Sequence, residues 1–138
     1  LICYRVKYPD DLVELQNVQW NPVLHWARKE LGISLKCVYG ILHEKQLSGE
    51  IEKIRTKINR FDHFTLTAFS EFVTISGSIL LALAVYFHYL RVEEAWKKSV
   101  LDEVWQCSKW GQTGESIRIR ENKLKDFKFA YEFLTLLK

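Results

Sequence analysis

The chain has 138 residues, of which 48% are hydrophobic and 27% charged, with only 6 Gly and 2 Pro. This composition excludes an intrinsically disordered tail and a collagen-like repeat, and the length suits a single packed domain. The net charge of +3 is smaller than that of dedicated nucleic-acid-binding domains, which gather basic residues on one face. The chain has no Met and begins at Leu1, so we expect it to be a piece of a longer protein.

The residue types that usually carry chemistry are scattered. Cys3, Cys37 and Cys107 are widely spaced and odd in number, which predicts a reducing compartment and small buried thiols instead of a disulfide framework. No phosphate-binding, zincin or hydrolase motif occurs in the sequence. We therefore expect no enzymatic activity, no metal and no cofactor. The four histidines also give no reason to expect a metal site, because they lack the spacing of metal ligands: His25, His43, His63 and His88.

In the first third of the chain, the apolar spacing predicts two consecutive helices within Pro9–Leu31. Asn21 is the expected N-cap of the second helix, Pro22 its first residue and Gly32 its C-terminal stop. The partial alternation in Ile33–Tyr39 predicts the one candidate strand, whose partner we expect in the missing part of the protein.

The pattern of apolar residues predicts helices in the rest of the chain. One helix is expected from Ser48, and the next follows Asp62 as its N-cap, with Gly77-Ser78 as a break or a close-packing point. Two further segments, Val92–Lys109 and Glu115–Leu137, have helical periodicity. The expected fold class is all-α, with six or seven helices and at most one or two short strands.

Residues Phe72–Leu90 carry no formal charge and are long enough to span a membrane. They include polar residues, and no cluster of Lys and Arg flanks them. A helix that is apolar all round is also typical of a protein core, on which the amphipathic helices pack. We therefore favour a buried core segment over a membrane span.

The C-terminal stretch mixes basic and aromatic residues, as nucleic-acid-binding proteins do. Helical spacing offers an alternative, because five apolar residues fall on one face and leave the basic residues on a solvated face: Ile117, Leu124, Phe127, Tyr131 and Leu134. We favour helix packing and expect no nucleic-acid partner. An RNA contact through Arg118, Arg120 and Lys123 is the weaker reading.

The segment Leu101–Gly111 has two stripes at helical spacing. The first, Leu101, Val104 and Cys107, is expected to face the core. The second combines a carboxylate, an amide and an indole, namely Glu103, Gln106 and Trp110. Such a set suits a protein contact, since Trp supplies apolar area and the polar pair supplies orientation. The alternative is that Trp105 and Trp110 are core residues and Glu103 a surface charge.

Residues along most of the chain match a known family. The matches are Cys3-Tyr4-Arg5, Pro9, Leu12, Gln16, Trp20-x-Pro22, Trp26, Gly77-Ser78, Leu80, Ala82-Leu83, Ala95-Trp96, Ser99 and Asp102-Glu103-x-Trp105-Gln106-x-x-x-Trp110-Gly111. By their order and spacing the chain resembles the ATP-twelve family, the assembly chaperones that bind the alpha subunit of the F-type ATP synthase catalytic head.

The resemblance implies that residues 1–138 form a helical C-terminal chaperone domain, preceded by a β-rich N-terminal domain outside this chain. It implies a non-enzymatic chaperone of the mitochondrial matrix or the alphaproteobacterial cytoplasm, whose partner is unassembled alpha subunit. In the family an acidic position of the closing motif is important, and Glu103 matches it. The expected partner-binding residues are Asp102, Glu103, Trp105, Gln106 and Trp110.

Three departures from the family pattern keep an alternative open. Val104 stands where the family often has an acid, Asn21 stands where Asp is common, and the tail after Gly111 is basic and rich in Phe. The alternative is a divergent member that serves as a structural or interaction subunit of a larger mitochondrial complex.

Overall fold

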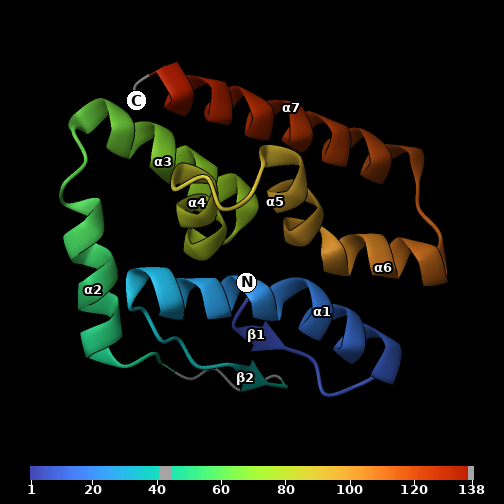
Figure 1. Cartoon of the computed structure of the whole chain (residues 1–138). Helices are drawn as coiled ribbons and strands as arrows, with labels where there is room; N and C mark the ends of the chain where they lie inside the picture. Colours follow the sequence, from blue (N-terminus) through green and yellow to red (C-terminus); the bar gives the residue numbers. More distant parts are fainter. Residues whose placement is uncertain (41–44, 137–138) are drawn as a thin grey trace. The chain divides into compact units, whose positions relative to one another are not determined.

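A computed structural model describes residues 1–40 and 45–136 (Figure 1). Within these residues the chain forms seven α-helices, one π-helical turn and a sheet of two very short strands, which confirms the all-α fold class. The backbone divides into two compact units, Leu1–Asp62 and His63–Lys138. We describe each unit by itself.

The main helix of the first unit is α1, Asp10–Trp26, and it runs without interruption through Pro22. The prediction of two helices that meet at Asn21 is therefore wrong. Proline removes the N–H that would bond to the carbonyl of Val18, and its ring crowds that carbonyl, but the buried face continues across it. The residues of that face recur every three or four positions: Leu12, Gln16, Trp20, Val23 and Trp26.

The predicted stop at Gly32 is confirmed. Helix α1 continues into a π-helical turn, η1, Ala27–Leu31, which ends where Gly32 adopts a left-handed conformation with φ of 69°. Glycine takes this conformation without the steric penalty of a Cβ atom. Ile33, which follows, is fully buried.

The predicted strand is shorter than expected, and its partner lies within the chain. Strand β2, Val38–Tyr39, pairs in parallel with β1, Tyr4–Arg5. The prediction that the partner belongs to a missing part is wrong, because a strand of two residues near the N-terminus gives too little alternation to be recognised. Cys3 and Cys37, which precede the paired residues, are half-buried thiols and not the fully buried ones expected.

The segment before β2 is held by side chains of the following part of the chain. The backbone N–H of Ser34 donates to Oε2 of Glu50 at 2.7 Å. Gln46 both accepts from the N–H of Lys36 at 2.9 Å and donates to its carbonyl at 2.8 Å. These bonds replace the sheet ladder that a longer strand would need. Glu50 lies in α2, Ser48–Ile58, the helix predicted from Ser48.

The second unit begins with α3, His63–Ser76, and α4, Ile79–Tyr86. Gly77 separates them with φ of 71°, and Ser78 caps α4 by accepting a 3.2 Å hydrogen bond from the N–H of Leu81. Of the two alternatives for Gly77-Ser78, the break is therefore confirmed. Phe64 is 68% exposed, because the buried face of α3 is set by Ala68, Phe69 and Phe72.

The uncharged stretch Phe72–Leu90 is divided by the break at Gly77 and extends past the end of α4, and every residue of Leu80–Val85 is buried. This confirms the interpretation as a core segment. Across residues 1–40 and 45–136, none of the helices has both the length and the apolar character needed to cross a membrane.

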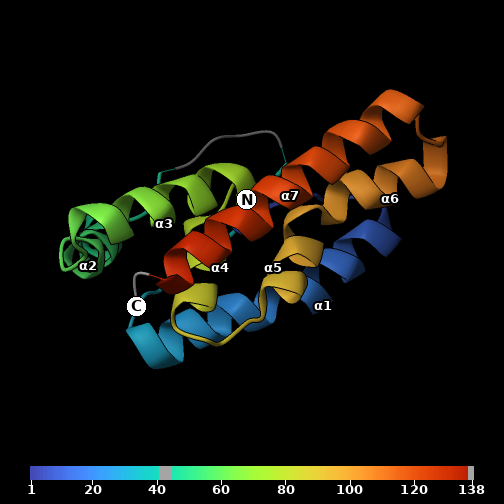
Figure 2. The same ribbon diagram turned by 90° about the horizontal axis from the view of Figure 1, so that it is seen from above.

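Three helices complete the second unit. The predicted helix Val92–Lys109 is divided at Val100 into α5, Val92–Ser99, and α6, Leu101–Trp110. The last is α7, Gly114–Leu136, which packs along α3 and α5 (Figure 2). The final residue of the predicted helix Glu115–Leu137 lies outside the described residues.

The core between these helices is aromatic. The ring of Phe127 lies 4.2 Å from that of Phe72 and 5.4 Å from that of Trp96, measured between centroids. Phe127 and Leu134 are buried, as the predicted apolar face of this helix requires, while Arg118, Lys123 and Lys125 are exposed. Packing therefore accounts for Phe127, whereas Phe129 in the same stretch is 72% exposed and is not explained by packing.

Candidate functional site

Helix α6 is attached to the second unit by its first turn. Leu101 is 5% exposed and is the one buried residue of the ten in this helix. Val104, predicted to face the core, is 49% exposed, so this prediction is wrong. The break at Val100 turns α6 away from α5, and the inward-facing stripe therefore meets the core only at its start. Most of the surface of α6 is left open for a contact.

The predicted interaction stripe is present on that open surface. Glu103, Gln106 and Trp110 follow one another at intervals of three and four residues, so they share one side of α6. All three are exposed, and the exposed fraction of Trp110 is 82%. Trp110 has the largest apolar side chain of this stripe, so it is the central feature of the candidate site. It is not a core residue.

The two other predicted residues lie on the neighbouring side of the helix. Asp102 and Trp105 are half-buried, and the Nζ of Lys109 lies 5.8 Å from the centroid of the Trp105 ring. A cation over an indole face is stabilised by the ring's electron density. Trp105 therefore supports the helix surface beside the exposed stripe, and the structure does not bring it onto the same side as Trp110.

Hydrogen bonds that the sequence did not predict fix α6 against the start of α7. Arg120 donates to Oε1 of Gln112 at 2.6 Å and to Sγ of Cys107 at 3.5 Å. Thr113 and Ser116 each donate a backbone N–H to the other's hydroxyl at 3.1 Å, which forms a tight turn between the helices. Arg120 thus acts as a structural residue, whereas the sequence reading had grouped it with the basic surface.

The chemistry of this site is that of a contact surface. It offers one indole, one amide and one carboxylate, which bind by apolar contact and directed hydrogen bonds. Within residues 1–40 and 45–136, no group of three or more His, Cys, Asp and Glu side chains is placed to hold a metal ion. His43 lies outside the described residues.

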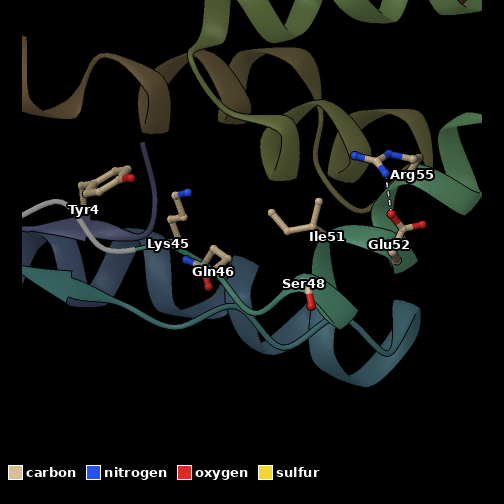
Figure 3. A pocket seen from close by; sticks show the side chains of 7 residues that line it. All are labelled: Tyr4, Lys45, Gln46, Ser48, Ile51, Glu52 and Arg55. Atoms are coloured by element: carbon tan, nitrogen blue, oxygen red, sulfur yellow. Dashed lines mark hydrogen bonds and ion pairs between the residues drawn. The ribbon is translucent and has the colours of Figure 1, made fainter.

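The first unit contains a separate hollow of about 440 Å³ beside the start of α2 (Figure 3). Its lining residues are Tyr4, Lys45, Gln46, Ser48, Ile51, Glu52 and Arg55. The cationic side chain of Arg55 is already paired with Glu52 one helical turn away. The hollow is open and carries none of the residues predicted for function.

Comparisons with known proteins are informative about ancestry. No family model matches the chain. It is 26% identical over 123 residues to the mitochondrial protein Atp12 of Schizosaccharomyces pombe, which covers 87% of this chain and 42% of that protein. The crystal structure of Atp12 from Paracoccus denitrificans superposes with a TM-score of 0.94 at 30% identity, over 99% of this chain and 59% of that one.

A candidate chaperone from Agrobacterium tumefaciens matches with a TM-score of 0.94 at 35% identity, over 100% of this chain and 52% of its own. The chain thus spans about half the length of the relatives it matches.

The described residues form a helical fold in which most residues of α6 are not buried. Over nearly its whole length the chain is similar to Atp12 proteins in both sequence and backbone, which supports membership of the ATP-twelve family of the sequence resemblance.

Proposed function

We propose that this chain is the helical C-terminal domain of a chaperone for ATP synthase assembly, and that it binds unassembled alpha subunit through α6. Similarity to Atp12 proteins supports the assembly role. In this proposal the protein covers apolar surface of the alpha subunit until the neighbouring subunit takes its place. It works by binding alone, without catalysis or cofactor, in the mitochondrial matrix or an alphaproteobacterial cytoplasm.

The observation that carries the site is the exposure of Trp110 beside Glu103 and Gln106 on a lightly packed helix. Trp residues at the centre of interfaces supply much of the binding free energy. Glu103 supplies a charge that selects a basic or hydrogen-bond-donating group on the partner. Asp102 and Trp105 lie beside this stripe and would contact the partner at its border.

The test is recovery of unassembled alpha subunit by the tagged protein. Glu103→Lys and Trp110→Ala should each weaken binding, and so reduce recovery, by about fivefold or more, since removal of an interface anchor costs more than about 1 kcal/mol. Glu121→Lys is the matched control, because it makes the same charge change on an exposed position of α7. Circular dichroism should show the same helix content in all four proteins.

Equal recovery by the Glu103 and Trp110 variants would reject α6 as the site. Stoichiometric co-purification with a finished complex, in place of release, would favour the alternative of a fixed subunit in a larger mitochondrial assembly.

A further inference from the structure

A groove between α3 and α7 of the second unit is separate from the α6 surface. The two helices run antiparallel (Figure 1) and enclose a hollow of about 320 Å³. Its floor is made of the small buried residues Ala68 and Ala130. A volume near the lower end of the range for ligand clefts, about 300–1,000 Å³, accepts a few side chains of a partner.

The walls of the groove are apolar and unusually exposed. Phe129 is 72% exposed and Phe133 is 40% exposed, and Ile75 lines the same hollow from α3. Phe64 and Leu136 extend the apolar strip by one helical turn at the same end of the two helices, and they are 68% and 83% exposed. A contiguous apolar strip of this kind on a folded protein marks a binding surface.

Two carboxylates give the groove a charge. Glu71 on α3 and Asp126 on α7 both line it and are exposed. Neither forms an ion pair with any residue in the part of the chain that the structure describes. The chain as a whole carries a charge of +3, so an acidic lining is a local feature. It would attract basic groups of a partner.

We propose that the α3–α7 groove is a second docking surface, which binds an amphipathic helical segment of a partner protein with Lys or Arg beside its apolar side chains. The apolar residues of the segment would fill the hollow against Phe129 and Phe133, and its basic residues would pair with Glu71 and Asp126. Amphipathic helices commonly bind in grooves in this way. The proposal does not depend on the role of α6 or on the alpha subunit.

The direct test uses two labelled synthetic peptides and the complete chain. One is an amphipathic helix of Leu, Ala and Lys, and the other is the same peptide with Glu in place of each Lys. Fluorescence anisotropy should show that the Lys peptide binds at least about tenfold more tightly, because only its charges complement the groove. Equal binding of the two peptides would overturn the proposal.

Charge reversal locates the binding site. The double variant Glu71→Lys/Asp126→Lys should reverse the preference, so that the Glu peptide becomes the tighter ligand. The matched control, Glu14→Lys/Glu121→Lys, changes the net charge equally at exposed positions outside the groove and should leave the preference unchanged. Reversal by the control variant, or none by the groove variant, would reject the groove as the site.

Two further measurements separate the competing occupants. Phe129→Ala should weaken both peptides, and it should not unfold the chain because this side chain is mostly in water. Sedimentation velocity tests whether a second copy of the chain fills the groove. A dimer that dissociates in the Phe129→Ala variant would replace our proposal with self-association.

Discussion

Nη1 of Arg5 donates a 2.9 Å hydrogen bond to Oδ1 of Asn21, and this bond joins the N-terminal strand to the middle of α1. Arg5 is only 3% exposed, and its guanidinium also lies 5.4 Å from the ring centroid of Trp20. Among residues 1–40 and 45–136, no carboxylate pairs with this buried charge, and Nη2 has no hydrogen-bond partner. The amide of Asn21 therefore solvates a cation without neutralising it.

Asn21→Asp should stabilise the protein, because it places a carboxylate against the Arg5 guanidinium. We expect a gain of about 1 kcal/mol in the free energy of unfolding at pH 7, limited by the exposure of position 21. Arg5 should lower the pKa of the new carboxyl below its ordinary value of about 3.9. The gain is then present above that value and is lost as the pH falls through the lowered pKa.

Urea titrations at pH 7 and at acidic pH measure this effect. Asn122→Asp is the control, because it adds the same charge at an exposed position of α7. A gain of equal size in both variants, or one that persists at acidic pH, would show that Arg5 is not responsible.

Pro22→Ala tests the continuity of α1. In the interior of a helix, proline leaves the carbonyl of residue i−4 without its N–H partner and is less favourable than alanine by about 3 kcal/mol. Replacement should therefore stabilise the chain, by about 1–3 kcal/mol in thermal or urea unfolding. At the first position of a separate helix, proline is favourable, so a loss of stability would instead support two helices.

Phe127→Ala should be among the most damaging substitutions in the second unit. The ring is fully buried between Phe72 and Trp96, so its removal leaves a cavity and costs about 3–5 kcal/mol. Phe129→Ala removes the same group two residues along α7, where it is 72% exposed, and should change stability by less than about 0.5 kcal/mol. Similar losses for the two variants in urea unfolding would contradict the orientation of α7.

Mild oxidation should join Cys3 to Cys37. Tyr4 pairs with Val38 in the parallel sheet, and the N–H of Val38 donates to the carbonyl of Cys3 at 2.7 Å. The two cysteines therefore lie opposite each other, at the spacing of neighbouring strands of about 4.8 Å, which a disulfide spans. The oxidant is an added low-molecular-weight disulfide. It accepts the two electrons that the cysteine thiols lose and is released as two thiols.

Burial raises the pKa of the Cys3 thiol, and the neighbouring Cys37 raises it further. Since the thiolate is the reactive form, disulfide formation should be slow at neutral pH and continue to accelerate above the ordinary thiol pKa of about 8.5. Mass spectrometry of unreduced peptides identifies the pair. The Cys107→Ser variant should still form the bond, and a Cys3–Cys107 product would contradict the register of the sheet.

Helical periodicity was enough to predict the fold class, the stop at Gly32 and the α7 face that contains Phe127 and Leu134. These features depend on neighbours within a few residues, for which the sequence itself holds the information. The exposed stripe of Glu103, Gln106 and Trp110 could also be predicted, because its residues share one side of a single helix. Its role in binding stays a prediction.

Tertiary contacts decided the rest. Pro22 stays inside α1 because the buried face continues past it, and the two-residue strand β1 exists only because β2 lies beside it. Val104 is exposed because α6 meets the core only through Leu101. The α3–α7 groove is lined by residues that are far apart in the chain, such as Glu71 and Asp126. Local patterns determine which residues form helices, whereas burial depends on distant segments that pack against them, and no short window of sequence contains those segments.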